Sequence, residues 1–175
     1  MIRYLLPLIA LVLFFLEPVF GLFSPLQFDG DYYYIVPRFL LMFLIFVTVY
    51  YNPKQAMIYG LIFGLLYDVF FIDIIGLYAV LYPLMCLIAG YIVKSVHRNL
   101  LVATLATLVL TAFFEFVLYL FFSFISLISM PVDIFLTSRL LPTMIANSLF
   151  LVMLGWAFKS VIVARLLERE NNKAL

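Results

Sequence analysis

The stretch LLVATLATLVLTAFFEFVLYLFFSF occupies residues 100–124 and contains a single charged residue, Glu115. A helix needs about 20 mostly apolar residues to cross the hydrocarbon core of a bilayer, so this stretch predicts a transmembrane helix. The rest of the chain has the same character. Of its 175 residues, 68% are apolar and 11% are charged, against roughly 45–50% and about 25% in soluble domains. We therefore expect an integral membrane protein, with no length left for a separate soluble catalytic domain.

Five further apolar segments accompany this one, and together they predict an all-α integral membrane protein with six transmembrane helices. The predicted spans are about 4–24, 35–52, 55–73, 75–94, 100–124 and 134–158. They form one domain, residues 1–158, followed by a charged tail, residues 159–175. The first span is longer than the roughly 7–15 apolar residues of a signal peptide, and no small-x-small cleavage site follows it, which favours an uncleaved anchor.

Basic residues near short loops favour the cytoplasmic side of a membrane, and they alternate along this chain. Eight of the ten bases fall on one predicted side: Arg3, Lys54, Lys94, Arg98, Lys159, Arg165, Arg169 and Lys173. The exceptions are Arg38 and Arg139. The connections on the other side carry acids instead, namely Asp29, Asp31, Asp73 and Asp133. This pattern predicts that both termini, and with them the tail, lie in the cytoplasm.

The composition excludes several kinds of chemistry. Cys86 is the only cysteine and His97 the only histidine, so neither an intramolecular disulfide nor a multi-Cys/His metal cluster can form. The net charge of +1 gives no indication of nucleic-acid binding. An intramembrane enzyme would need a nucleophile beside a base, and His97 lies in a predicted cytoplasmic loop. We expect no cofactor, no metal and no enzymatic activity.

Four ionisable residues fall inside the predicted spans, where a charged side chain needs a partner or water. They are Glu17, Asp68, Glu115 and Arg139. With a helical rise of about 1.5 Å per residue, all four lie in the outer half of a hydrocarbon core about 30 Å thick. We expect a buried charge cluster in which the guanidinium of Arg139 pairs with Glu115 or with Asp68. The spacing leaves both partners open.

This cluster has a functional and a structural interpretation. A proton or ion relay would continue toward the cytoplasm, but the inner halves of these spans contain no further carboxylate. We therefore favour a structural ion pair that fixes how the third, fifth and sixth spans pack. Thr143 and Asn147 follow Arg139 at i+4 and i+8, which predicts a supporting polar face that bonds a neighbouring helix or lines a small cavity.

Small residues recur at helical spacing in two spans, which predicts close helix packing. In the third span, Gly60 and Gly64 precede Asp68 at intervals of four residues. In the fourth span the spacing resembles a heptad repeat, and its residues are Gly76, Ala79, Pro83, Cys86 and Gly90. The helix that packs along these two seams is internal, a second copy of the chain or a different membrane protein. A homodimer is therefore one of the possibilities.

Two groups of residues form longer motifs. The first comprises Val36-Pro37-Arg38-Phe39, Ala56-Met57-Ile58-Tyr59-Gly60, Gly64, Tyr67-Asp68 and Gly76-Leu77-Tyr78. The second comprises Glu115-Phe116, Asp133, Arg139-Leu140-Leu141-Pro142-Thr143 and Asn147. These motifs resemble the MreD family of bacterial rod-shape-determining proteins, and most of all its members from Gram-positive rods. The most specific element is Tyr-Gly-x-x-x-Gly-x-x-Tyr-Asp followed by Gly76, and the resemblance runs over almost the whole chain.

The resemblance implies a non-catalytic scaffold of the cell-elongation machinery in the bacterial cytoplasmic membrane. Such proteins bind MreC, a single-span protein with an extracellular domain. Through MreC they connect MreB filaments to RodA and its class B penicillin-binding partner in peptidoglycan synthesis. On this basis we expect the chain to present a groove at the level of the lipids to the single helix of MreC.

A second functional hypothesis comes from the fold that the resemblance implies. The family resembles the S-components of energy-coupling-factor vitamin transporters, so the alternative is a small-molecule-binding membrane subunit of such a transporter. The outer-half charge cluster would then enclose a polar ligand. Against this alternative, the first span has only Ala10 and Gly21 as small residues before Ser24, so the alanine-rich docking stripe of S-components is absent.

Overall fold

The computed structural model describes residues 4–28, 30–95 and 99–174. The described residues form six main helices and one short hairpin, so the predicted all-α fold with six helices is confirmed. Several residues of the charge pattern, namely Arg3, Asp29, His97 and Arg98, lie outside the described residues, as do the side chains of Lys94 and Lys173.

The main helices are α1 (Leu5–Gly21), α2 (Phe39–Tyr50), α3 (Pro53–Tyr67), α4 (Leu77–Ser95), α5 (Leu100–Phe124) and α7 (Leu141–Ala174). Strands β1 (Leu26–Phe28) and β2 (Asp31–Tyr33) pair as an antiparallel hairpin between α1 and α2. A π-helical segment, η2 (Asp68–Ile72), continues α3. The short α6 (Val132–Ile134) and the π-helical η3 (Phe135–Leu140) lead into α7, so the chain is helical from Val132 to Ala174.

Three helical stretches are long and apolar enough to cross a membrane: Pro53–Ile72, Leu100–Phe124 and Val132–Asn171. The second predicted span, 35–52, differs from the prediction because its helix begins only at Phe39, after four non-helical residues. Pro37 explains the late start, since a proline disfavours helix in the residue before it. Three extended residues, 35–37, at about 3.3 Å and 12 helical residues at about 1.5 Å reach roughly 28 Å, close to the thickness of the hydrocarbon core.

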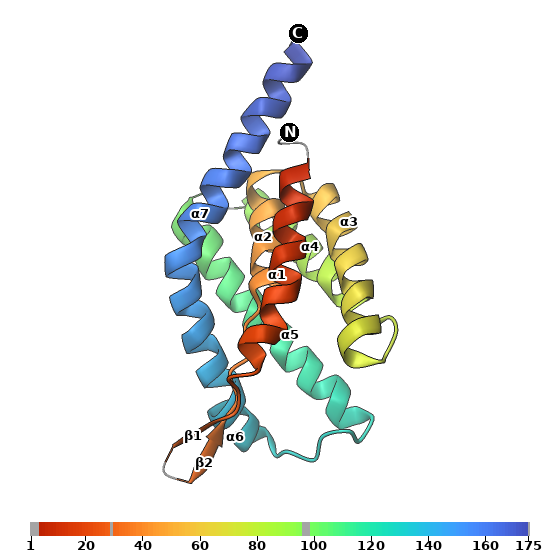
Figure 1. Cartoon of the computed structure of the whole chain (residues 1–175), viewed down its shortest axis with the longest axis vertical. Coiled ribbons are helices and arrows are strands. Elements are labelled where there is room, and N and C mark those ends of the chain that lie inside the picture. The colour runs from red at the N-terminus through yellow and green to blue at the C-terminus, as the bar shows by residue number, and fades with distance from the viewer. Residues whose placement is uncertain (1–3, 29, 96–98, 175) are drawn as a thin grey trace.

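Helix α2 forms the centre of the molecule. All of its residues are buried, as expected of a helix that is apolar on every side. It contacts α1, α3, α4, α5 and α7. In Figure 1 the start of α1 and the end of α7 lie at one end of the molecule, and the hairpin and α6 lie at the opposite end.

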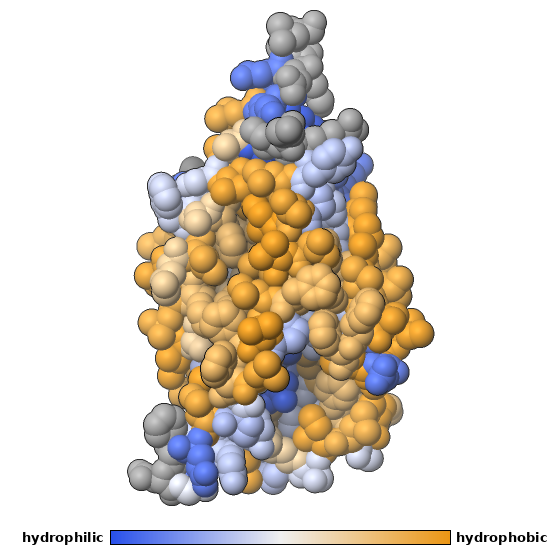
Figure 2. Space-filling view, in the orientation of Figure 1, coloured by the Kyte–Doolittle hydropathy of each residue, from blue (hydrophilic) through white to orange (hydrophobic). Residues whose placement is uncertain are grey.

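The outer surface of the helices is strongly apolar. Figure 2 shows hydrophobic side chains over the middle of the visible face and hydrophilic ones mainly toward its two ends. On α7, Val152, Met153 and Trp156 are 79%, 75% and 69% exposed. Exposed apolar surface of this extent is rare on soluble proteins, and it fits contact with lipid.

The small residues of α3 lie where this helix packs on α4. A Cβ atom added to Gly60 would lie 3.1 Å from the backbone nitrogen of Pro83. One added to Gly64 would lie 2.8 Å from the Cα atom of Ala79, and it would also meet the carbonyl of Tyr78. Such close approach of two backbones is the physical use of small residues inside a membrane. This part of the two predicted seams therefore has an internal partner.

The remaining seam residues have other surroundings. Cys86 is completely buried in the core. A Cβ atom on Gly90 would make only ordinary contact, at 3.6 Å from the Cβ atom of Pro53. Gly76 has a φ angle of 107°, a left-handed conformation that favours glycine, and lies in the turn before α4. Ala79, Pro83 and Gly90 of the fourth span thus all lie against α3, whereas Cys86 is buried in the core and Gly76 lies in the turn before the helix.

Candidate functional site

Arg38 lies where the extended residues 35–37 join α2, and its side chain is 2% exposed. Its Nε donates a hydrogen bond to Oε1 of Glu115 at 2.5 Å, and its Nη1 donates to the hydroxyl of Tyr78 at 3.1 Å. The guanidinium carbon also lies 5.2 Å from the ring centroid of Phe114. A buried guanidinium is tolerated when a carboxylate and further hydrogen bonds compensate for its lost hydration, and this site supplies both.

Glu115 on α5 is the centre of the charge network. Besides Arg38, it accepts a hydrogen bond at Oε2 from Nη2 of Arg139 at 3.4 Å. The carboxylate is completely buried, whereas the side chain of Arg139 is 28% exposed. Of the two partners that the sequence left open for Arg139, the structure therefore selects Glu115. The network joins α2, α5 and η3, which are far apart in the sequence.

Arg38 is the member of this network that the sequence analysis missed. The distribution of bases predicts an external connection for Arg38, as an exception to the rule, and does not include it among the buried charges. The error followed from placing the start of a regular helix at residue 35, which put Arg38 near the end of the span. The available signal was the combination of Pro37, which breaks the helix, with a base inside an otherwise apolar segment.

Asp68 belongs to a different site. Its carboxylate accepts hydrogen bonds from the backbone nitrogens of Gly76 at 2.9 Å, Tyr78 at 2.7 Å and Ala79 at 3.1 Å. These groups lie at the N-terminus of α4, where backbone N–H groups have no partner within the helix and a negative charge is favoured. The expected cluster of four charges is therefore divided, and Asp68 anchors the start of α4 to the end of α3.

An Asp68→Asn substitution tests this role. An amide keeps one acceptor oxygen and turns an NH2 group toward the remaining backbone N–H groups, so at least one of the three hydrogen bonds is lost. We expect the free energy of unfolding to fall by about 1–3 kcal/mol, the cost of a buried unsatisfied group. The measurement is thermal unfolding in detergent. Asp133→Asn, at an exposed position, is the matched control and should leave the midpoint unchanged; an equal loss in both variants would contradict the assignment.

Glu17 connects α1 to the start of α2. Its Oε1 accepts a hydrogen bond from the backbone nitrogen of Leu40 at 2.8 Å, and the residue is 2% exposed. Arg38, at the N-cap of α2, makes no side-chain capping bond. A carboxylate from another helix therefore performs the function that a Ser, Thr, Asp or Asn at the cap performs in most helices. Glu17 bonds to neither arginine in the described structure, although it lies in the same region.

Thr143 and Asn147 hold the extended segment before α2. Thr143 Oγ1 accepts a hydrogen bond from the nitrogen of Val36 and donates one to the carbonyl of Tyr34, both at 3.2 Å. Asn147 donates to the carbonyl of Val36 at 3.0 Å and accepts from the nitrogen of Arg38 at 2.9 Å. Non-helical backbone at membrane depth needs such partners, because lipid provides none. The polar face of α7 thus pairs with an extended segment rather than with a helix.

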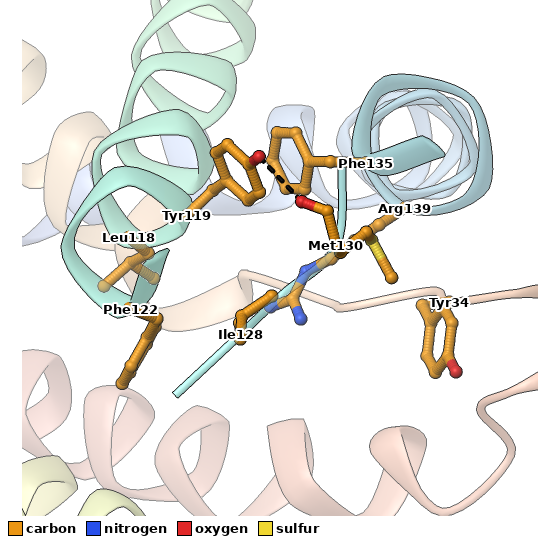
Figure 3. Close-up of a pocket in the computed structure, with 8 residues that line it drawn as sticks. All are labelled: Tyr34, Leu118, Tyr119, Phe122, Ile128, Met130, Phe135 and Arg139. Carbon is orange, nitrogen blue, oxygen red and sulfur yellow. Dashed lines mark hydrogen bonds between the residues drawn. The ribbon is translucent and has the colours of Figure 1, made fainter. Parts of the chain in front are cut away.

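Arg139 also lines an apolar pocket of about 50 Å³ on the other side of the network, shown in Figure 3. The pocket lies between the end of α5, the following loop and η3. Its aromatic wall contains Tyr119 and Phe135, whose stacked ring centroids are 4.2 Å apart. The hydroxyl of Tyr119 donates to the carbonyl of Met130 at 2.9 Å, which ties the loop to α5 (Figure 3). The ring stack and this hydrogen bond connect α5, the loop and η3 at the end of the molecule that contains the hairpin.

The buried polar groups of this site connect one helix to another. In residues 4–28, 30–95 and 99–174, no group of three or more His, Cys, Asp or Glu side chains is arranged to hold a metal ion. Each of the three buried carboxylates accepts hydrogen bonds from another element: Glu17 from α2, Asp68 from α4 and its preceding turn, and Glu115 from two arginines. The arrangement positions helices that the sequence separates widely.

Comparison with known proteins identifies the family. The family model for the rod shape-determining protein MreD matches residues 1–162. The chain belongs to the MreD family. It is 33% identical over 145 residues to the rod shape-determining protein MreD of Bacillus subtilis (strain 168), covering 83% of this chain and 84% of that protein. It is 29% identical over 155 residues to the cell shape-determining protein MreD of Streptococcus pneumoniae (strain ATCC BAA-255 / R6), covering 89% and 91%.

The resemblance found in the motifs is therefore confirmed, including its Gram-positive character. As a member of the MreD family, the chain is a rod shape-determining membrane protein. No solved structure matches it, so the expected likeness to transporter S-components stays a prediction.

Proposed function

We propose that this MreD-family protein is a non-catalytic membrane scaffold of the cell-elongation complex. In this proposal it binds MreC and thereby helps couple MreB filaments to peptidoglycan synthesis by RodA and a class B penicillin-binding protein. The observation that carries the proposal is the ion pair between Arg38 and Glu115, which lies completely inside the chain and joins α2 to α5. Because this pair fixes the position of α2 against α5, it supports a structural role, as a scaffold requires.

The lipid-facing surface offers a place for the single helix of MreC. The close approach of α3 and α4 at Gly60 and Gly64 already uses those glycines internally. A different groove, of about 450 Å³, lies between α5 and α7 and includes Val152 and Trp156. Its lining is mostly apolar, and helix association in a membrane depends on van der Waals packing into such surfaces. We place the MreC contact in this groove.

Co-purification tests the proposal directly. Tagged protein extracted in mild detergent is expected to retain MreC. A Val152→Trp substitution, which fills the groove, is expected to reduce the retained MreC by about tenfold, equivalent to about 1.4 kcal/mol. The matched control is Ile58→Trp on α3, an exposed position outside the groove, which should leave binding intact. Failure of the unmodified protein to retain MreC would contradict the proposed function, whereas equal retention by both variants would contradict only the groove.

We also infer that both termini face the cytoplasm. The start of α1 and the end of α7 lie at the same end of the molecule (Figure 1), which an even number of spans requires. Lys159 lies 5.6 Å from the ring centroid of Tyr50, and Arg169 lies 5.4 Å from that of Tyr51, so these two bases are at the end where α2 stops. An accumulation of bases at one end supports the cytoplasmic assignment.

The transporter alternative has one observation in its favour. A cavity with charged side chains in a mainly apolar lining adjoins Glu17 and the two arginines, as a ligand site beneath the hairpin would require. The surroundings of this cavity indicate a ligand that comes from the membrane.

A further inference from the structure

A cavity of about 330 Å³ lies beside the last turn of α1. Residues of α1, the extended segment, α3, η2, α4 and η3 line it, and they include Glu17, Arg38, Tyr67, Phe71 and Arg139. Figure 2 shows hydrophilic surface recessed between hydrophobic side chains in the lower half of the visible face. The cavity therefore combines a charged floor with an apolar rim.

Two charged atoms at this cavity have no hydrogen-bond partner among the described residues. They are Oε2 of Glu17 and Nε of Arg139, and both atoms are buried. Glu17 as a whole is 98% buried, because only 2% of it is exposed. A buried charged group without a partner costs free energy, so each atom favours a ligand that forms a hydrogen bond with it. The carboxylate oxygen requires a donor, and the guanidinium nitrogen requires an acceptor.

The charge balance of the network indicates the type of ligand. Glu115 is shared between Arg38 and Arg139, and its bond to Arg139 is the longer of the two, at 3.4 Å against 2.5 Å. Arg139 therefore retains capacity for a second anion. Glu17 accepts a hydrogen bond at Oε1 from the backbone N–H group of Leu40, and the hydroxyl of Tyr67 lies beside its carboxylate. Neither partner is a cation, so Glu17 retains capacity for one. The cavity thus offers one cationic and one anionic partner, which matches a zwitterion.

The rim of the cavity indicates where this ligand comes from. Val19 and Phe70, next to lining residues of α1 and η2, are 50% and 67% exposed on the apolar surface. The cavity also lies at the end of α1, just before the hairpin, which is the level of the lipid headgroups in a chain of six spans. A lipid whose acyl chains remain among these side chains can place its headgroup in the cavity.

We propose that this cavity binds the headgroup of a zwitterionic phospholipid that carries a primary ammonium, as in phosphatidylethanolamine. The phosphate accepts a hydrogen bond from Nε of Arg139, and the ammonium donates one to Oε2 of Glu17. Both hydrogen bonds are charge-assisted, the stronger class of such bonds. This binding site goes beyond the scaffold function and does not depend on it.

A headgroup series on the unmodified full-length protein tests the proposal. Delipidated protein is titrated with phosphatidylethanolamine, phosphatidylcholine or phosphatidylglycerol of identical acyl chains, and bound lipid is counted by native mass spectrometry. We expect phosphatidylethanolamine to bind about tenfold more tightly than the other two. Phosphatidylcholine has a quaternary ammonium without N–H groups, and phosphatidylglycerol has no cation. Equal binding of all three would overturn the proposal, and so would equally strong displacement by free phosphoethanolamine, which would indicate a soluble ligand.

Two variants locate the bound headgroup. Glu17→Gln keeps an oxygen for the N–H group of Leu40 but loses the negative charge, so the preference for phosphatidylethanolamine over phosphatidylcholine should disappear. Arg139→Gln should weaken all three phosphate-bearing lipids together. Glu168→Gln and Arg165→Gln, which remove a charge from the ion pair in the projecting part of α7, are the matched controls. Retention of the headgroup preference in Glu17→Gln would overturn the assignment, and if this variant fails to fold, the headgroup series decides.

Discussion

Replacing Glu115 with alanine is expected to destabilise the protein by about 3–5 kcal/mol, because Arg38 would remain buried without its carboxylate. The side chain of Arg38 is 2% exposed and its guanidinium lies against the rings of Tyr78 and Phe114, so solvent compensates little for the lost partner. Arg139 would lose its ion pair as well. We expect the unfolding midpoint in detergent to fall steeply, with much of the protein lost to aggregation during extraction.

A double substitution separates the charge effect from the packing effect. Changing both Arg38 and Glu115 to methionine removes the completely buried charge and leaves only Arg139, whose side chain is 28% exposed, without its carboxylate. We expect this variant to recover most of the stability that Glu115→Ala loses. Glu168→Ala serves as the control, since the side chains of Arg165 and Glu168 are 12% and 34% exposed, against 2% and 0% for Arg38 and Glu115. Ion pairs in contact with solvent contribute about 0–1 kcal/mol. If Glu115→Ala and Glu168→Ala unfolded at the same temperature, the structural role of the buried pair would be refuted.

A bulky residue at Gly64 is expected to have the second large effect. The backbone of α4 approaches so closely that even a Cβ atom would lie 2.7 Å from the carbonyl carbon of Tyr78. Gly64→Leu must therefore separate α3 from α4, and we expect it to abolish the folded state. Gly64→Ala should cost about 1–3 kcal/mol through overpacking, although alanine forms helix better than glycine by about 1 kcal/mol.

Gly90→Ala is the matched control for this prediction. The added methyl group would make only ordinary contacts, 3.6 Å from Pro53 and 3.7 Å from Thr48. We expect its stability to be unchanged or slightly increased, because only the gain in helix propensity remains. Thermal unfolding of the two alanine variants in the same detergent provides the comparison, and a Gly90→Ala variant as unstable as Gly64→Ala would contradict the account.

The same contrast shows how far the sequence analysis reached at the seams. The spacing of Gly60 and Gly64 was sufficient to predict a close helix contact, since small residues at intervals of four align on one helix face. It did not identify the contacting helix. The choice of α4 depends on how two helices are rotated against each other, and that rotation is not a property of either segment alone.

The charge network was predictable in part for the same reason. A base inside a span requires an acid, which correctly restricted the partner of Arg139 to Glu115 or Asp68. The burial of Arg38 cannot be predicted from its own segment, because it depends on an extended stretch held by Thr143 and Asn147. These bonds join residues separated by more than 100 positions in the sequence. Asp68 is buried as expected but belongs to a different cluster, at the start of α4.

The sequence by itself determined that this is an all-α membrane protein with six helices, and its motifs were sufficient to indicate the MreD family. These properties are local, because a membrane helix satisfies its own backbone hydrogen bonds and needs only a long apolar segment. Tertiary structure alone decided the interruption of the second span and the pairing of each buried charge. An ion pair between α2 and α5, 77 residues apart, exists only when the helices have reached their final depth and rotation, since a shift of one residue moves a side chain by about 100° around its helix.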